Sequence, residues 1–314
     1  MSFTDGMSDI GTGEISITVG SEEMEYAIET LEGWNMVGLS VLTDMPGVEN
    51  IFPNSISGTL FSFDDGYQSE TALSPGSGYW LRFDTTGTTT IFGHPINELV
   101  ISLSEGWNLV SGLHYDLSIY SINDPDSTIV PSTLFGYTDS YSVSEILEPG
   151  EGYWLRAFQD GDVTISGSGL ARISPQDFSL NDKANTLTIN GMDLYFGVEI
   201  SAKEKLSYSL PPKPPVGGKD MRFSDDTKFC GTDQCVIELM DGGKPLTLEF
   251  DIKNEQVWEI IDGSGSVTKC TGAQNLDMNV GLEQIILRRS AKAQIPKTYV
   301  LHPAYPNPFN PVTT

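Results

Sequence analysis

The first 170 residues contain almost no basic side chains: Arg82 and Arg156 stand against 25 acidic residues, and the whole chain has a formal net charge of −26. A surface of this sign repels nucleic acid and anionic membranes, so we expect neither as a partner. No run of eighteen or more apolar residues occurs, so the sequence predicts no membrane span. The opening MSFTDGMSDI has neither the basic first segment nor the apolar second segment of a secretory signal peptide. We expect either a cytosolic chain or a piece of a longer protein.

Cysteine and histidine are also scarce, with three of each. Cys230 and Cys235 are separated by four residues, a spacing compatible with a small disulfide-closed loop in an oxidising compartment. Free thiols are the alternative. A zinc site is disfavoured because none of the histidines, His94, His114 and His302, lies near the cysteines in sequence.

Motifs of catalysis are missing as well. The chain has no Gly-x-Ser-x-Gly elbow, His-Glu-x-x-His helix, phosphate loop or dinucleotide fingerprint. Its 43 acidic residues offer so many carboxylate pairs that no single pair indicates a glycosidase. We therefore expect no enzyme.

An internal duplication organises what is present. EGWNMV at 32–37 returns as EGWNLV at 105–110, an offset of 73 residues. The segment at 59–82 returns at 133–156, an offset of 74, with 13 of 24 positions identical. Each longer segment ends in Pro-Gly-x-Gly-Tyr-Trp-Leu-Arg. A repeat of this kind predicts two copies of one structural unit.

The local pattern in both copies is that of β-strands, because turn signals recur every eight to twelve residues between short apolar and aromatic runs. We predict an all-β chain, with tandem small β-sandwich or barrel repeats followed by a further β-sandwich domain. The expected divisions are a lead-in strand or linker at 1–30, repeats at 31–98 and 99–170, a sandwich at 171–295, and a terminal linker at 296–314.

The two arginines occupy the same position in the two repeats, and each lies two residues after a tryptophan. Trp80 and Arg82 therefore share one face of a strand, as do Trp154 and Arg156. We favour a structural lock, in which each arginine stacks on its neighbouring tryptophan and pairs with Asp65 or Asp139. The alternative is an exposed patch that binds a glycan or a partner's carboxylate.

Acidic turns and a proline-rich stretch are further candidates. Asp64 and Asp65, and likewise Asp124 and Asp126, are candidate calcium ligands, although we favour solvated turn caps. Calcium is the one cofactor that we consider. Leu210–Gly218 contains four prolines and must be extended, and we favour a rigid connection over a ligand for proline-binding modules.

The most specific string is Ala304-Tyr-Pro-Asn-Pro-Phe-Asn-Pro-Val-Thr-Thr314. It resembles the opening of the C-terminal sorting domain of type IX secretion cargo from Bacteroidetes-like bacteria. The motif residues are Tyr305, Pro306, Asn307, Pro308, Phe309, Asn310 and Pro311. The resemblance makes 296–314 a linker with the truncated start of that domain. It implies a secreted or cell-surface protein of a Gram-negative bacterium, a cysteine pair in an oxidising setting, and the secretion machinery as partner of a complete motif.

These observations together predict a non-catalytic accessory or structural module of an exported surface protein, either spacing or adhesive. One alternative is a glycan-binding module, for which the repeat tryptophans would have to be exposed. The other is the C-terminal tail of an exported hydrolase whose catalytic domain lies upstream. A cell-surface glycan or protein is the expected partner of an adhesive module.

Overall fold

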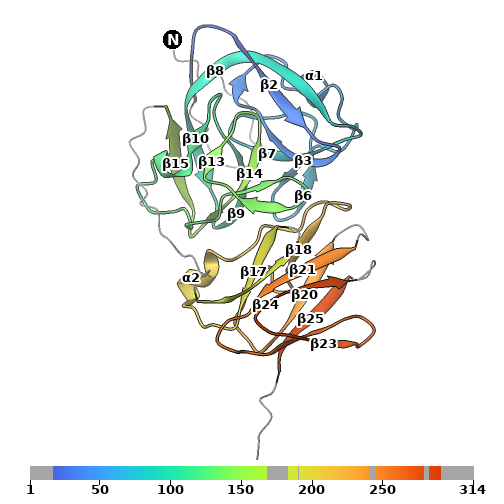
Figure 1. Cartoon of the computed structure of the whole chain (residues 1–314). Helices are drawn as coiled ribbons and strands as arrows, with labels where there is room; N and C mark the ends of the chain where they lie inside the picture. Colours follow the sequence, from blue (N-terminus) through green and yellow to red (C-terminus); the bar gives the residue numbers. More distant parts are fainter. Residues whose placement is uncertain (1–16, 168–182, 190, 241–244, 279–282, 291–314) are drawn as a thin grey trace, which may run out of the picture.

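The computed structural model describes residues 17–167, 183–189, 191–240, 245–278 and 283–290. The chain is all-β, with two tandem repeats above a β-sandwich in Figure 1. Within the described ranges no helix has the length and apolar character that crossing a membrane requires. The predicted sorting motif, Tyr305–Pro311, lies outside these ranges.

Repeat 1 is built from two small sheets that enclose an apolar core. One sheet has the order β3-β7-β5-β6, and the other pairs β2 and β4 with the first half of the long strand β8. Its elements are β2 (Met24–Thr30), β3 (Gly33–Gly38), β4 (Val41–Leu42), α1 (Val48–Ile51), β5 (Phe61–Phe63), β6 (Tyr67–Ser69), β7 (Gly78–Phe83) and β8 (Gly87–Leu103).

Repeat 2 reproduces this arrangement. Its sheet β12-β11-β14-β9 corresponds to the four-stranded sheet of repeat 1, and β15 pairs with the second half of β8. Its elements are β9 (Gly106–Ser111), β10 (Leu117–Ser118), η1 (Ile119–Ser121), β11 (Phe135–Tyr137), β12 (Tyr141–Val143), β13 (Ile146–Leu147), β14 (Gly152–Ala157) and β15 (Gly161–Ser166). The short strand β1 (Ile17–Val19) also pairs with β8.

Strand β8, the long cyan ribbon in Figure 1, belongs to both repeats. Its residues 87–93 pair with β2, and its residues 98–103 pair with β15. The expected boundary between 98 and 99 therefore falls inside a strand, and the expected lead-in at 1–30 contains β2, an integral strand of repeat 1. The strand continues through Gly93 and Pro95 to Leu103.

The two repeats meet through matching backbone contacts. Gly38 N donates to Gly150 O at 2.8 Å, and Ser111 N donates to Gly76 O at 3.0 Å. Gly38 corresponds to Ser111 and Gly76 to Gly150 in the duplication. The same patches are thus used reciprocally, which is the geometry of a twofold-symmetric dimer interface built within one chain.

We call the place where these backbone segments of the two repeats touch the crossing, and its close packing explains the Pro-Gly-x-Gly motif. A Cβ at Gly78 would lie 2.6 Å from Val110 O, and one at Gly152 would lie 2.7 Å from Val37 O. Gly76 adopts φ +82°, a left-handed conformation that glycine adopts without strain. The first glycine of the motif therefore makes the turn, and the second permits the close approach of the other repeat.

The third unit is a sandwich of two five-stranded sheets, ordered β19-β17-β16-β21-β24 and β18-β20-β25-β22-β23. Strand β21 alternates buried and exposed residues along its length, as a strand with one face toward a core should. The elements are β16 (Asn185–Ile189), β17 (Met192–Phe196), α2 (Ala202–Leu206), β18 (Asp220–Phe223), β19 (Phe229–Cys230), β20 (Gln234–Met240), β21 (Leu246–Asp251), β22 (Trp258–Ile261), β23 (Val267–Cys270), β24 (Ala273–Met278) and β25 (Gln284–Arg289).

Candidate functional site

Trp80 and Trp154 are fully buried, each with 0% of its surface exposed. The Tyr137 ring of repeat 2 packs edge-on against Trp80 with centroids 4.7 Å apart, and the Phe63 ring of repeat 1 packs against Trp154 at 4.9 Å. Since Phe63 and Tyr137 are repeat equivalents, the two contacts are reciprocal. An exposed glycan platform built on Trp80 and Trp154 does not exist here, because the two sheets face each other and cover both rings.

The arginines stack on different tryptophans from those expected. The Arg82 guanidinium lies 6.0 Å from the Trp34 ring centroid, and that of Arg156 lies 5.5 Å from Trp107. These tryptophans are the cross-strand partners of the arginines in the β3/β7 and β9/β14 registers. Directly opposed side chains in an antiparallel pair lie closer than neighbours two residues apart on one strand. The strand pairing therefore determines the stacking.

The expected acidic partners do not complete a lock. Asp139 forms an ion pair with Lys219 at 2.5 Å. Asp65 lies in the β5–β6 turn with φ +48°. Within the described ranges neither Arg82 nor Arg156 forms an ion pair with Asp65 or Asp139.

A pair of equivalent tyrosines holds the proline-rich loop of the sandwich. Tyr141 of repeat 2 donates its hydroxyl to Pro212 O at 2.7 Å, and Tyr67 of repeat 1 donates to Lys213 O at 2.6 Å. Burial raises the pKa of both hydroxyls, so each stays protonated as a donor. The reciprocal tyrosines of the repeat pair thus bind two consecutive carbonyls of an extended segment, as aromatic-lined grooves bind polyproline.

Two further contacts continue this interface along the loop. Trp34 donates Nε1–H to Val216 O at 3.1 Å. Tyr137 donates to Lys219 O at 3.1 Å and accepts from Lys219 N at 2.7 Å. Burial raises the pKa of Tyr137 to about 12. We call Tyr67, Tyr141, Tyr137 and Trp34 the aromatic clamp.

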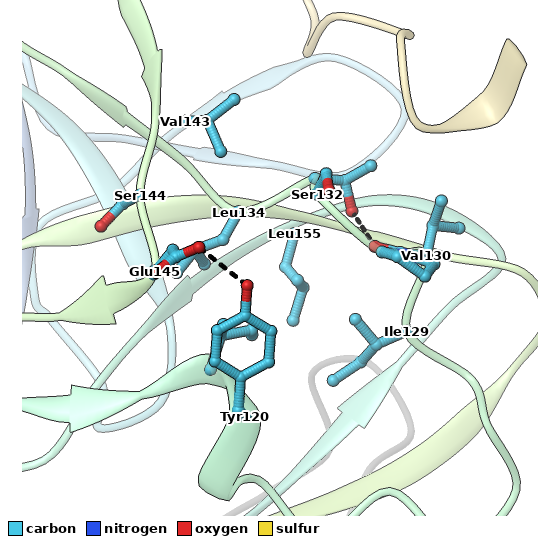
Figure 2. A pocket seen from close by; sticks show the side chains of 12 residues that line it. Tyr120, Ile129, Val130, Ser132, Leu134, Val143, Ser144, Glu145 and Leu155 are labelled. Carbon is cyan, nitrogen blue, oxygen red and sulfur yellow. Dashed lines mark hydrogen bonds between the residues drawn. The ribbon is translucent and has the colours of Figure 1, made fainter. Parts of the chain in front are cut away.

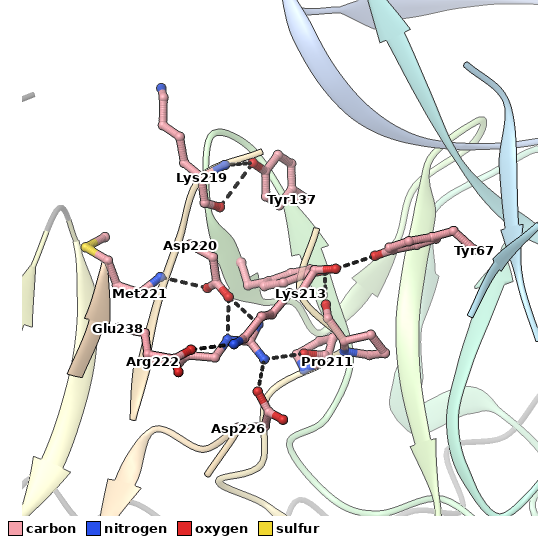
Figure 3. A network of polar contacts seen from close by, with 12 residues as sticks. Tyr67, Tyr137, Pro211, Lys213, Lys219, Asp220, Met221, Arg222, Asp226 and Glu238 are labelled. Carbon is pink, nitrogen blue, oxygen red and sulfur yellow. Dashed lines mark hydrogen bonds and ion pairs between the residues drawn. The ribbon is translucent and has the colours of Figure 1, made fainter. Parts of the chain in front are cut away.

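A buried ionic network fixes the sandwich side of the loop (Figure 3). The Arg222 side chain has 0% exposure, and its Nε donates to Asp220 Oδ2 at 2.5 Å. Its Nη1 donates to Pro211 O at 2.7 Å and to Asp226 Oδ1 at 2.9 Å. Burial raises the pKa of Asp220 although the Arg222 charge opposes that shift. Removing one partner would leave a buried charge uncompensated, so the network is costly to break.

A pocket of about 620 Å³ lies where repeat 2 meets the sandwich. Arg156 and Trp107 line its repeat side, and burial lowers the pKa of Arg156 while Glu105 opposes the change. The sandwich contributes α2, the start of the proline-rich loop and the segment from β18 to β20. The lining residues on this side are Lys205, Leu206, Ser209, Leu210, Pro211, Pro212, Asp225, Asp226, Thr227, Phe229, Gly231, Thr232 and Cys235.

A second cavity lies within repeat 2 (Figure 2). Its volume is about 60 Å³, and Tyr120 donates to Glu145 Oε1 at 2.8 Å beside it. Pockets for organic ligands usually measure about 300–1,000 Å³, so this cavity is too small to bind one.

The remaining predicted residues are two cysteines and the acidic turn residues. Cys230 and Cys235 form a disulfide with Cα atoms 6.2 Å apart, and Cys270 is a buried free thiol. Asp124 caps a turn, accepting from Thr128 N at 2.8 Å. In the part of the chain that the structure describes, no group of three or more His, Cys, Asp or Glu side chains is placed to hold a metal ion.

The sequence patterns placed Trp34 and Trp107 among the repeat tryptophans of a possible glycan platform, but they did not single out the clamp tyrosines Tyr67, Tyr137 and Tyr141. Tyr67 and Tyr141 occupy equivalent positions of the duplication, and both are tyrosine. This identity was the one feature of the sequence that could have indicated a reciprocal pair. Comparison of the chain with protein-family models, with curated proteins and with solved structures finds no match.

Proposed function

We propose that this chain is a rigid, non-catalytic spacer module of an exported bacterial surface protein. The observation that carries the proposal is the aromatic clamp, which joins the repeat pair to the sandwich. A flexible linker between independent domains would not require buried tyrosine donors on consecutive carbonyls of a proline-rich loop. Proline limits the conformations of that loop before it docks, so docking it costs little further entropy.

Apolar and cationic contacts support the same rigid junction. Leu210 and Met192 of the sandwich are buried in the aromatic cluster between the repeats. Lys228 of the sandwich lies 5.2 Å from the ring centroid of Phe135 in repeat 2. Apolar burial and hydrogen bonding at one interface favour a fixed angle between the units over free domain motion.

Export is the second part of the proposal. The resemblance of residues 304–314 to a type IX sorting domain supports it, and so does the Cys230–Cys235 disulfide, since such bonds persist in oxidising compartments. In the organism that makes this protein, replacing Tyr305–Pro311 by alanines should abolish surface labelling of the protein. Unchanged labelling of intact cells would contradict export by this route.

The spacer role is tested by calorimetry. We expect the repeats and the sandwich to unfold in one cooperative transition, because each buries part of the other. The double variant Tyr67→Phe/Tyr141→Phe should separate this into two transitions, since it removes both clamp hydrogen bonds while keeping the rings. Two resolved transitions in the native chain would contradict a rigid module.

A further inference from the structure

The two equivalent Trp–Arg pairs of the repeats differ in what lies against them. In repeat 1, Trp34 Nε1 is bonded to Val216 O, so the proline-rich loop occupies this position. In repeat 2, Trp107 lines the 620 Å³ pocket, and its Nε1 has no hydrogen-bond partner among the described residues. The fold thus presents the same donor twice, once occupied by an extended peptide and once open.

The path of the loop explains the difference. From Tyr141 and Tyr67 it continues in the carboxyl direction to Trp34. In the other direction it pairs with the sandwich, where Leu210 N donates to Asp226 O at 2.8 Å and Ser209 bridges Thr227. The loop therefore does not cover Trp107 and Arg156 of repeat 2 as it covers Trp34 of repeat 1. It forms one wall of the pocket that these two residues line.

The charges around the pocket indicate what would bind there. Arg156 stacks on Trp107, and Lys205 of α2 supplies a second cation. Asp226 already bonds Arg222, which leaves Asp225 and the nearby Glu105 as the opposing acids. A carboxylate between Arg156 and Lys205 would gain charge-assisted hydrogen bonds, and arginine suits this task because its fork can be bidentate.

We propose that this pocket binds an extended, proline-containing acidic peptide segment of another protein. A backbone carbonyl of the peptide accepts from Trp107 Nε1, as Val216 O accepts from Trp34, and an acidic side chain contacts Arg156 and Lys205. Leu210, Pro211 and Phe229 provide the apolar wall that proline rings require. The volume lies within the range of about 300–1,000 Å³ that ligand pockets occupy.

Two synthetic peptides test the proposal on the full chain. LPPEPPVGG copies the chain's own loop with its lysine changed to glutamate, and LPPKPPVGG is the unchanged control. Binding is followed by NMR through the indole N–H signals, of which the chain has five. Trp107→Phe identifies its own signal by removing it. We expect the acidic peptide to shift the Trp107 signal, and the lysine peptide to bind about tenfold more weakly.

Variants then locate the contact. Arg156→Gln and Trp107→Phe should each weaken binding of LPPEPPVGG at least about tenfold, because each removes one donor to the peptide. Isothermal titration calorimetry measures this affinity for all variants, since Trp107→Phe lacks the reporting indole signal. Arg82→Gln in repeat 1 is the matched control and should change it less than about twofold. Thermal melting of each variant confirms that it is folded.

The proposal is overturned by three results. One is the absence of any indole shift at millimolar peptide. Another is equal weakening by Arg82→Gln and Arg156→Gln, which would place binding elsewhere. The third is displacement of the Trp107 signal by an acidic oligosaccharide such as oligogalacturonate but not by the peptide, which would assign the pocket to a sugar. None of these results bears on the calorimetric test of the spacer role.

Discussion

Repeats 1 and 2 share one scaffold but have different neighbours. Their buried contacts match position by position: Trp80 and Trp154, Tyr67 and Tyr141, and the glycines at the crossing are used reciprocally. Their rims differ. Duplication has thus retained the buried rings that join the repeats and the two tyrosines that bind the loop, while single positions at the crossing and beside the sandwich have diverged.

Two substituted pairs, and one identical pair with different neighbours, show this divergence. Repeat 1 has Ser77 where repeat 2 has Glu151, and Phe63 where repeat 2 has Tyr137. The hydroxyl that distinguishes Tyr137 bonds Lys219 of the sandwich. Trp34 is covered by the loop, whereas its equivalent Trp107 lines a pocket. Exchanging residues between the repeats is therefore the direct way to test which contacts are shared.

The largest effect is expected where the repeats are equivalent. Trp80→Ala and Trp154→Ala should each lower the free energy of unfolding by about 3–5 kcal/mol, the usual cost of removing a large buried aromatic side chain. The two losses should agree within about 1 kcal/mol, because the rings have reciprocal surroundings. Urea denaturation measures both. A near-neutral effect of either substitution would refute the reciprocal core.

Glu151 should make the repeat-2 side of the crossing depend on pH. Burial, with a smaller contribution from Glu148, raises the pKa of Glu151 from 4.5 to about 7. Its protonated form favours folding below the unfolded pKa, and that contribution is lost as pH rises through about 7. Glu151→Ser, the residue of repeat 1, should therefore raise the free energy of unfolding by about 1–3 kcal/mol at about pH 8 relative to about pH 4.

Urea unfolding of both proteins at the two pH values measures this effect. Glu148→Gln is the control and should reproduce only a minor part of it, because Glu148 is the lesser cause of the shift. The same pH dependence in the native chain and in Glu151→Ser would contradict the assignment.

A smaller effect is expected at the junction with the sandwich. Tyr137→Phe installs the repeat-1 residue and removes both hydrogen bonds with Lys219, which should cost about 1–2 kcal/mol. Phe63→Tyr is the reverse exchange and should give no gain, because Phe63 packs on Trp154 instead of on the loop. Thermal unfolding of the two variants compares them, and an equal gain from Phe63→Tyr would argue against the assigned roles.

The smallest effect belongs to the arginines. Arg82 is exposed, so Arg82→Gln should cost no more than about 0.5 kcal/mol of stability. Arg156 is half-buried on Trp107, and Arg156→Gln should cost about 1 kcal/mol. Chemical denaturation of the two variants measures the difference. A large loss of stability in Arg82→Gln would show that Arg82 has the structural role first expected for it.

The sequence was sufficient for the all-β class, for the duplication, and for the shared face of Trp80 and Arg82. Alternation along a strand gives two faces, but it does not say that another repeat covers one of them. The cross-strand stacking of Arg82 on Trp34 could not be predicted from the sequence either, because it depends on the register of β3 and β7. The expected boundary between 98 and 99 divided strand β8, because a duplication gives the length of the repeated unit but does not show that one strand pairs in both copies.

The central claim is that the repeats and the sandwich form one rigid body, and a distance measurement tests it most directly. Phe92 in repeat 1 and Val267 in the sandwich are 61% and 50% exposed, so cysteine replacements there can carry spin labels. Pulsed electron paramagnetic resonance should give one narrow distance distribution in the native chain, which broadens in the Tyr67→Phe/Tyr141→Phe background. A broad or multimodal distribution in the native chain would contradict the account.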